Sequence, residues 1–497
     1  MSCENTVLLL SGSQHYDEKR PVTGKIHRFA ESVDPLGIAI VAAYARRYGL
    51  EVKWMEMEPG QSAKIEAAME GVKGVFISSR FFDSSLAQEA IDTAHNRGIK
   101  SVVGGYAVFN GGVFNTADTR VKGEVEPVTD RLFDDFRSGR LQSLYDSTKL
   151  PPYDITGSYV WPDRSIFGRR GSFIRHPQEW ERGCTNYCSF CSPTRMQRPE
   201  IDDGGNKHVR VRAIPDIIAE IEAMKLKPGD QLFSSDLNTS AIPNELLKEL
   251  FGYLKRKEIK WYAEGTVSPL VADYEKNGFK DSLIGLMSAR NVGGGCYSFL
   301  YGADDLIARK VAGSLDKKTA EIKKAVEIFR FTGIPLYLSV VVGLDNHEFP
   351  GSFFQIARFL EDVQAPYSFI HIATPYSGTP WGDKVNKEGR IIDNEPSHYN
   401  HRRAVHEPKN MTAGELQQGY YWLLKTLYTP TSIAKTAAVN SAYGGGSKNL
   451  LLGALNAGVP WGVETYLTVL ELKARGYLDA KIQKQMDYEY KNWKKGT

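Results

Sequence analysis

The sequence contains few cysteines, five among 497 residues. A small, odd number argues against a disulfide framework and fits a reducing compartment and metal binding better. Three of the five, Cys184, Cys188 and Cys191, fall within eight residues, and the other two, Cys3 and Cys296, are far away in the sequence. We therefore expect one metal-binding loop rather than a cross-linked fold.

Charge of one sign and long apolar runs are also missing. The 62 basic and 59 acidic residues are interspersed and leave a net charge of +3, so we expect no nucleic-acid partner. The most apolar stretch, residues 449–473, contains Glu464, Glu471 and an internal Gly-Val-Pro, which favours a buried helical hairpin over a membrane span of about 20 residues. Residues 1–10 lack the basic flank and the cleavage site of a signal peptide. We expect a cytoplasmic protein.

The length predicts about three domains. We place them at residues 1–145, 146–395 and 396–497. The first two alternate strand and helix patterns, and the third is mainly helical. This order predicts an α/β protein with two parallel sheets and a C-terminal helical domain.

Residues 1–145 are typical of a Rossmann-like, doubly wound parallel sheet. A helix is expected to begin with Asp34 as its cap and Pro35 as its first residue. Strands are expected at residues 7–11, 51–55, 74–78 and 100–103. In such a sheet a ligand lies outside the carboxyl ends of the strands, and glycine there lets a large ligand approach the backbone. The residues expected to line this crevice are Ser11, Ser78, Ser79, Gly104, Gly105, Tyr106, Gly123 and Glu124.

Residues 146–395 repeat the alternation of strands and helices, which predicts a partial or full (β/α) barrel. The first barrel strand is expected at residues 178–181. The later strands are expected at residues 231–234, 259–264, 294–301, 336–342 and 368–372. The ends of these strands should face the cysteine loop.

The third domain should form a small helical cap over the open face of the barrel. An amphipathic helix is expected at residues 413–428, with Thr412 as its cap and Glu415 at its third position. Two further helices are expected near residues 449–455 and 463–473.

The cysteine loop has the spacing CxxxCxxC and no fourth cysteine or histidine nearby. Three thiolates can hold an iron–sulfur cubane and leave one iron without a protein ligand. A ferredoxin would supply a fourth cysteine, and a structural zinc site would supply four ligands. A chance cluster or an adventitious metal site is the alternative interpretation.

With Phe190 before the last cysteine, the loop resembles the signature of radical S-adenosylmethionine enzymes. The resemblance implies a 4Fe-4S cluster held by Cys184, Cys188 and Cys191. It also implies that S-adenosylmethionine binds the open iron and yields a 5'-deoxyadenosyl radical.

The first domain resembles the cobalamin-binding domain that precedes many radical S-adenosylmethionine enzymes. The resemblance rests on Asp34-Pro-Leu-Gly37, on a strand that ends in Gly104-Gly105, and on Lys122-Gly-Glu124 before a helix. It implies that the crevice residues bind cobalamin. The Asp-x-His-x-x-Gly motif is missing, so the resemblance implies cobalamin bound base-off without a histidine ligand. The histidines of this domain are His15, His27 and His95. A domain that kept the fold but lost its cofactor is the alternative.

Polar residues at the ends of the barrel strands resemble the contacts that this family makes to S-adenosylmethionine. The candidates are Asp236, Asn238, Asp304, Asp305, Gly343 and Asp345. Each of them could equally be a helix cap or a turn former. Candidates for a catalytic role are Cys296, Tyr297 and Tyr301, for which core packing is the alternative and, for Cys296, the favoured one.

Three later segments complete the resemblance. They are Thr374 to Pro380, Glu388-Gly-Arg390, and Pro408-x-x-Met-Thr-x-x-Glu-Leu. With them, almost the whole chain is similar to cobalamin-dependent radical S-adenosylmethionine enzymes of the group that includes hopanoid methylases and magnesium-protoporphyrin cyclases.

This resemblance implies a C-methyltransferase. The radical would remove hydrogen from an unactivated carbon, and methylcobalamin would deliver the methyl group. One alternative is oxidative cyclisation or rearrangement without methyl transfer, and another is a non-catalytic cobalamin-binding sensor. The implied partners are a small-molecule or lipid substrate and a low-potential electron donor such as flavodoxin or ferredoxin.

Overall fold

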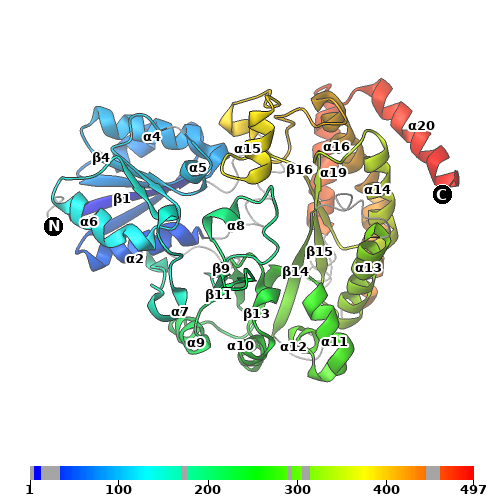
Figure 1. Cartoon of the computed structure of the whole chain (residues 1–497), viewed down its shortest axis with the longest axis horizontal. Coiled ribbons are helices and arrows are strands. Elements are labelled where there is room, and N and C mark those ends of the chain that lie inside the picture. Colours follow the sequence, from blue (N-terminus) through cyan, green and yellow to red (C-terminus); the bar gives the residue numbers. More distant parts are fainter. Residues whose placement is uncertain are drawn as a thin grey trace.

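Short apolar runs near the N-terminus form a six-stranded parallel sheet. The computed structural model describes residues 5–12, 34–112, 114–168, 176–288, 294–304, 314–443 and 459–496. The strands of the first sheet are β1 (Thr6–Gly12), β2 (Glu51–Met57), β3 (Gly74–Ser78), β4 (Lys100–Gly104), β5 (Thr119–Lys122) and β6 (Leu144–Asp146). Their order is β2-β1-β3-β4-β5-β6. With its helices this sheet forms the first of two α/β units that lie side by side (Figure 1).

Helices cover both faces of the first sheet. They are α2 (Leu36–Arg47), α3 (Ser62–Ala68), α4 (Ser84–Asn96), α5 (Tyr106–Phe109) and α6 (Thr129–Arg137). In β1, Val7 and Leu9 pack with α2 and α6, whereas Leu8 and Leu10 pack with α3, α4 and α5. The predicted doubly wound parallel sheet is confirmed, and its strand order reverses between β1 and β3.

Two details of the first unit differ from the prediction. Strands β5 and β6 were not predicted, because they contain only four and three residues. Helix α2 begins at Leu36, since Pro35 has φ −71° and ψ 102° and therefore an extended backbone. Asp34 thus lies one residue before the cap position.

The second sheet has six parallel strands whose order in space follows the chain. The strands are β7 (His176–Gln178), β12 (Gln231–Ser234), β13 (Lys260–Gly265), β14 (Gly295–Asp304), β15 (Leu336–Val342) and β16 (Ser368–Ile372). The helices outside it are α9 (Ile214–Ala223), α10 (Asn244–Arg256), α11 (Ser268–Asp281), α12 (Leu283–Met287), α13 (Ser314–Thr332) and α14 (Gly351–Val363). They share one apolar core with the sheet, so the predicted partial barrel is confirmed.

The first barrel strand was predicted at the wrong place. Strand β7 ends at Gln178, and a separate short strand, β8 (Glu181–Arg182), pairs antiparallel with β11 (Arg210–Val211). The reason lies in Asp236, whose Oδ1 accepts the backbone N–H groups of Trp180 at 2.7 Å and Glu181 at 2.9 Å. Because these two N–H groups donate to Asp236, they do not form ladder hydrogen bonds, and β7 ends before them.

The C-terminal helices are α16 (Ala413–Leu427), α17 (Pro430–Tyr443), α19 (Val459–Ala474) and α20 (Ala480–Gly496). Helix α16 begins with the predicted capping box, in which Thr412 and Glu415 each accept the other's backbone N–H. It packs on α14 and on the edge strand β16, where Leu416 and Trp422 join the core outside the sheet. The predicted cap over the open barrel face is therefore wrong. The helix expected at 449–455 lies outside the described residues.

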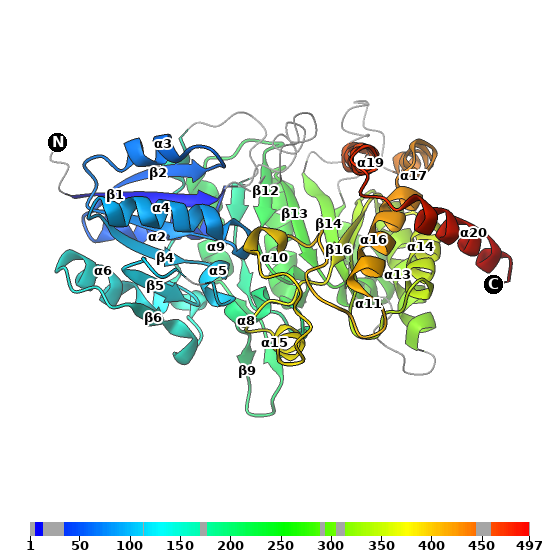
Figure 2. The same cartoon turned by 90° about the horizontal axis from the view of Figure 1, so that it is seen from above.

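The two units meet through short elements between the sheets. They are η2 (Phe81–Asp83), α8 (Pro193–Met196), α15 (Pro380–Lys387) and η7 (Pro396–His398). Figure 2 shows α8 and α15 beside α5. Phe81 contacts the rings of Tyr376 and Tyr399, with centroids 5.8 and 5.0 Å away. In the part of the chain that the structure describes, no helix is long and apolar enough to cross a membrane.

Candidate functional site

A cavity of about 390 Å³ lies at the carboxyl ends of the strands of the first sheet. Its walls include all eight crevice residues that the sequence indicated, Ser11, Ser78, Ser79, Gly104, Gly105, Tyr106, Gly123 and Glu124. Helix α2 adds the apolar side chains of Ile38, Ile40 and Val41. The second unit closes the cavity with Glu179, Arg182, Met196, Gln197 and Ser235. The cavity is therefore shared by both units, at the strand-order reversal where such sheets bind ligands.

Two of the three predicted crevice glycines, Gly105 and Gly123, have a positive φ that favours glycine whether or not a ligand is bound. Gly105 has φ 91°, and a Cβ there would lie 2.6 Å from the carbonyl oxygen of Ser79. Gly104, by contrast, has an ordinary φ and 3.5 Å of space to Val121. Of the three crevice glycines that the sequence indicated, Gly104 is thus the one that fits the expectation that glycine simply leaves room for a bound molecule.

No histidine lines this cavity among the described residues. His95 lies exposed at the end of α4. His15 and His27 lie outside the described residues. The polar groups that line the described part of the cavity are thus hydroxyl, amide, carboxylate and guanidinium groups, and α2 contributes an apolar wall.

A buried ionic cluster joins the two units beside the cavity. Arg182 donates to Glu124 at 2.8 Å, Glu126 at 2.6 Å and Glu179 at 2.9 Å. Arg210 also donates to Glu124, at 3.0 Å. Glu124 is therefore engaged by two guanidinium groups and links the units. The sequence analysis missed this role, although Arg182 stands two residues before Cys184.

Burial and charge act against each other in this cluster. Burial by itself would lower the pKa of Arg182, but Glu126, Glu179 and Glu124 hold it well above its usual range. Burial opposes ionisation of Glu126, yet Arg182 lowers its pKa. Burial raises the pKa of Glu179 despite the same guanidinium. Arg182 therefore stays charged, and Glu179 takes up a proton more readily than Glu126.

The cysteine loop runs between the cavity and the ends of the barrel strands. Cys184 is buried, whereas Cys188 and Cys191 are half-buried, and all three are free thiols. Burial raises the pKa of the Cys184 thiol. Tyr106 of the cavity is close enough to Cys191 for the two to interact electrostatically. The loop and the cavity therefore share an edge.

Contacts from both units hold the loop in place. Trp381 donates its backbone N–H to the carbonyl of Ser189 at 3.0 Å. Ser192 donates to Asn110 of the first unit at 2.6 Å. Phe190, the aromatic residue of the motif, packs on an apolar group at the end of β15. This group contains Val341, Leu344, Ala373, Trp381 and Val385.

The loop fits an iron–sulfur cluster by its donor set. Three free thiols at this spacing suit a cubane with one open iron, and the fourth cysteine that the structure describes, Cys296, lies in the barrel core. Among the described residues, no three His, Cys, Asp or Glu side chains already converge as a ready metal site. The fit thus rests on the thiols and on the loop that carries them.

Asp236 and Asn238, the candidates after β12, lie against the start of the cysteine loop. Asp236 is fully buried, and burial raises its pKa to about 6. Its Oδ2 accepts from Ser234 at 2.5 Å, in addition to the two backbone amides that its Oδ1 accepts. Asn238 places its amide nitrogen 3.7 Å from the Cys184 sulfur. Both side chains therefore support the loop, and contact with S-adenosylmethionine stays a prediction for them.

Gly343 and Asp345 lie in the turn after β15. Gly343 has φ 91°, donates to His347 and accepts from His406, both at 3.1 Å. Asp345 accepts from Lys384 at 2.8 Å and from Arg390 at 2.9 Å. Asp345 therefore anchors the Glu388-Gly-Arg390 segment to the barrel.

The remaining candidates divide between the core and undescribed positions. Cys296 and Tyr301 are buried in the core between sheet and helices, and burial raises the pKa of the Cys296 thiol. Tyr297 lies near Tyr262, with ring centroids 6.5 Å apart. The structure describes only the backbone of Asp304, and Asp305 lies outside the described residues.

Aromatic side chains outside the helix-side core form two groups on the second sheet, one on β12 and β13 and one on β15 and β16, which together we call the aromatic row. Phe233 stacks on Tyr262 at 4.5 Å between ring centroids. Farther along, Tyr337 contacts Phe369 at 6.2 Å, and Phe369 lies parallel to His371 at 6.4 Å. Burial lowers the pKa of His371 to about 3, with the help of His401 and Arg402. The sequence analysis missed this row, although alternation of aromatic residues in β16 was its signal.

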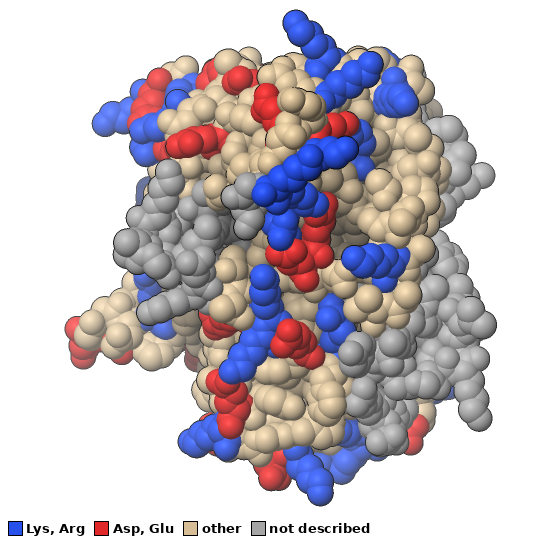
Figure 3. Space-filling view, turned by 90° about the vertical axis from the view of Figure 1, so that its right-hand side faces the viewer, with Lys and Arg blue, Asp and Glu red and all other residues tan. Residues whose placement is uncertain are grey.

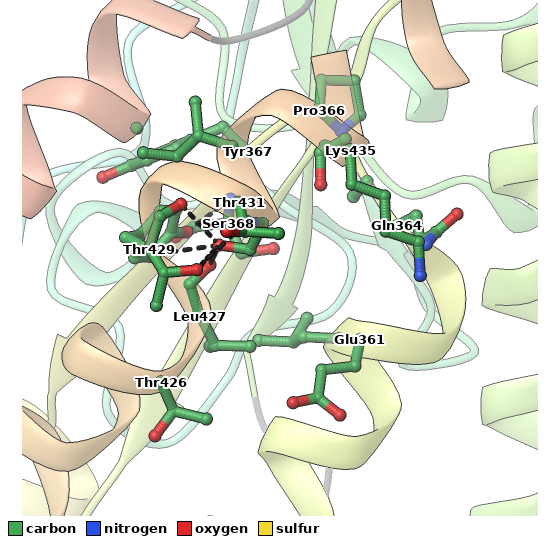
Figure 4. Close-up of a pocket in the computed structure, with 17 residues that line it drawn as sticks. Glu361, Gln364, Pro366, Tyr367, Ser368, Thr426, Leu427, Thr429, Thr431 and Lys435 are labelled. Atoms are coloured by element: carbon green, nitrogen blue, oxygen red, sulfur yellow. Dashed lines mark hydrogen bonds between the residues drawn. The ribbon is translucent and has the colours of Figure 1, made fainter. Parts of the chain in front are cut away.

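A second cavity, of about 370 Å³, lies at the opposite end of the second sheet. Figure 4 shows Tyr367, Ser368, Thr429 and Lys435 around it. Tyr428 accepts from Ser368 N at 3.0 Å and donates to its carbonyl, so these polar groups pair with one another. This cavity adjoins the start of β16, far along the strands from the cysteine loop.

The face of the molecule in Figure 3 has no large patch of charges of one sign. Lysine and arginine side chains there alternate with aspartate and glutamate. The pairs Lys425–Asp487 and Lys323–Asp362 belong to the described ion pairs of the C-terminal side. This pattern agrees with the net charge of +3.

No protein-family model matches the chain. The chain is 23% identical over 424 residues to bacteriochlorophyllide d C-12(1)-methyltransferase of Chlorobaculum tepidum, which covers 81% of this chain and 84% of that protein.

Solved structures share the fold over nearly the whole chain. The radical S-adenosylmethionine methyltransferase TsrM of Kitasatospora setae, with cobalamin and a [4Fe-4S] cluster bound, matches with a TM-score of 0.61 and 14% identity over 94% of this chain and 99% of that chain. The cobalamin-dependent S-adenosylmethionine radical enzyme OxsB, with aqua-cobalamin bound, matches with a TM-score of 0.58 and 14% identity over 98% of this chain and 84% of that chain. The predicted resemblance to such enzymes is confirmed at the level of the fold.

Proposed function

We propose that this protein is a cobalamin-dependent radical S-adenosylmethionine methyltransferase. One observation carries the proposal: the cavity of the first unit is completed by Glu179 and Arg182, which immediately precede the cysteine loop. A molecule bound in the cavity would therefore lie beside a cluster bound by the cysteines. The matching folds of TsrM and OxsB, and the methyltransferase named above, support the same proposal.

In this proposal Cys184, Cys188 and Cys191 hold a 4Fe-4S cluster, and S-adenosylmethionine binds at its open iron beside Asn238 and Gly343. The crevice residues hold cobalamin without a histidine ligand. Bound there, these groups supply hydrogen abstraction by a 5'-deoxyadenosyl radical and a methyl group from methylcobalamin.

The chain's own residues define the surroundings of the reaction. Arg182 and Glu124 hold the two units together, and the loop anchored by Trp381 and Asn110 keeps the thiols at the edge of the cavity. The aromatic row of the second sheet suits a substrate with an apolar ring system, because flat rings pack well on aromatic side chains. We propose a small-molecule or lipid substrate of that kind.

Two further parts of the proposal follow from the chemistry. Reduction of the cluster requires a low-potential electron donor such as flavodoxin or ferredoxin. Free thiols and an oxygen-sensitive cluster require a reducing compartment, so we propose the cytoplasm.

The test uses protein that is reconstituted anaerobically with iron, sulfide and hydroxocobalamin. With reductant and S-adenosylmethionine labelled in its methyl group, it should form 5'-deoxyadenosine and labelled methylcobalamin, both seen by mass spectrometry. Cys188→Ala should form no deoxyadenosine. A parent protein that binds cobalamin but never acquires the labelled methyl group would refute methyl transfer, and one that forms no deoxyadenosine would refute the radical chemistry.

A further inference from the structure

A guanidinium group packs against the cysteine loop. Arg195, in α8, donates to the carbonyl oxygens of Tyr187 and Cys188 at 3.0 and 3.3 Å. Its guanidinium carbon lies 3.4 Å from the centre of the Tyr187 ring. Arg195 thus closes the loop that begins at Cys184 and ends at Cys191.

Tyr187 requires this support. Its φ of 47° is in the left-handed region, which bulky residues rarely occupy. Such a conformation persists when its surroundings over-determine it. Arg195 contacts both the ring and the carbonyl of Tyr187 and so holds the backbone between Cys184 and Cys188.

The Nε–H of Arg195 is buried and has no hydrogen-bond partner among the described residues. A buried donor without a partner is costly, so it is available to an acceptor that binds next to it. The sulfur atoms of a cluster at the adjoining cysteines are such acceptors. Hydrogen bonds to the sulfurs and nearby net charge are both determinants of a cluster's reduction potential.

We propose that Arg195 is a positioning residue that closes the cysteine loop and raises the reduction potential of the cluster. This inference rests on the proposed function, since it requires the 4Fe-4S cluster. Reduction adds one negative charge to a cluster that three thiolates already surround. A guanidinium next to Cys188 favours that reduced form by Coulomb attraction and by its free N–H.

Lys207 offers a matched control. Its Nζ lies 4.7 Å from the centre of the same Tyr187 ring. Among the described residues it has no hydrogen bond to the carbonyls of the loop. Lys207→Gln therefore removes a nearby positive charge and leaves the closing contacts of Arg195 in place.

The experiment compares the parent, Arg195→Gln, Arg195→Lys and Lys207→Gln after anaerobic reconstitution. Iron and sulfide analysis measures the cluster, and a redox titration followed by electron paramagnetic resonance measures its potential. At the parent's midpoint, Arg195→Gln should lower the ratio of reduced to oxidised cluster about tenfold, a shift of about 59 mV for one electron. The midpoint potential of Arg195→Lys should lie between those of Arg195→Gln and the parent, because lysine keeps the positive charge but lacks the planar set of N–H donors of a guanidinium. The potential of Lys207→Gln should stay near that of the parent.

An Arg195→Gln protein with a full cluster and the parent's potential would overturn the inference. A potential shift in Lys207→Gln as large as that in Arg195→Gln would also overturn it, because any nearby positive charge would then explain the effect. If both Arg195 variants fold, by circular dichroism, but lose the cluster, the role in setting the potential is overturned and only the holding role is left. A parent chain that binds no four-iron cluster would instead refute the proposed function.

Discussion

Arg182 of the second unit and Glu124 of the first form a buried ion pair, 2.8 Å long, with side chains 4% and 5% exposed. Arg182 stands two residues before Cys184, and Glu124 lines the cavity. One contact therefore connects the two halves of the proposed active site. Loss of this ion pair should therefore disturb both the cavity and the cysteine loop.

Glu124→Gln should lower the free energy of unfolding by about 2 to 4 kcal/mol, because it removes a charge that compensates two buried guanidinium groups. Urea denaturation of the cluster-free protein measures this. Glu66→Gln is the control, since Glu66 meets Arg97 at 3.2 Å with side chains 58% and 38% exposed. The control should change stability by less than about 0.5 kcal/mol. Equal effects of the two variants would contradict the interpretation.

Substitution of Cys184, Cys188 or Cys191 by alanine should abolish the iron–sulfur cluster. Cys296→Ala should keep the full cluster, since Cys296 is buried in the barrel core, and should lower stability by about 1 kcal/mol. Iron and sulfide analysis distinguishes the variants. Full cluster content in any of the three loop variants would show that its thiol is not a ligand.

Gly104→Leu should weaken cobalamin binding at least about tenfold, because Gly104 lines the cavity and a Cβ there would meet its nearest neighbour, Val121, only at an ordinary contact distance of 3.5 Å. Equilibrium dialysis with hydroxocobalamin measures the affinity. Gly351→Leu is the control, since a Cβ at Gly351, at the start of α14, would meet nothing within 4 Å. Gly105→Leu is a poor test, because the side chain would collide with Ser79 even without cobalamin. Unchanged binding in Gly104→Leu would place cobalamin elsewhere.

His406 should make the protein less stable in acid. Burial lowers the pKa of His406 to about 4, and its Nε2 lies 3.1 Å from the carbonyl oxygen of Gly343. The unfolded chain, with a histidine pKa near 6.5, binds the proton more readily. Stability from this group is therefore present above about pH 6.5 and is lost as the pH falls toward 4.

His406→Gln keeps a donor for Gly343 but cannot titrate. Between pH 7.5 and pH 5 the parent should lose about 2 kcal/mol more than this variant. Urea denaturation of the cluster-free protein at the two pH values gives the difference. An identical loss in both proteins would show that His406 does not contribute.

The sequence predicted those parts of the site that depend on neighbours along the chain. Strand ends in a parallel sheet meet at one edge, so the eight crevice residues could be brought together without a structure. The spacing of the three cysteines and the aromatic residue between them also lie within one short segment, so the sequence shows them directly. For the same reason the strands at residues 74–78, 231–234 and 336–342 were predicted with their observed ends.

The missed features depend on residues that are distant in the sequence. Asp236 is 56 positions from Trp180, and it ends β7 early by accepting the amide of Trp180. Glu124 and Arg182 are 58 positions apart, and Asp345 and Arg390 are 45 apart. No local pattern reveals which carboxylate will meet which guanidinium. The sequence analysis therefore did not reveal that these acidic residues pair with arginines or accept backbone amides, and their contact with a ligand stays a prediction.

The aromatic contact of Phe81 with Tyr376 and Tyr399 lies apart from the ionic cluster of Arg182 and connects the same two units. One attachment is apolar and the other ionic, so the two units are joined by two contacts of different chemistry. The first unit therefore cannot be exchanged as a cassette between relatives unless η7 and the residues around Arg182 are carried with it. A chimaera that replaced residues 5–146 alone would leave Tyr376 and Tyr399 exposed on one side and Arg182 short of two carboxylates on the other.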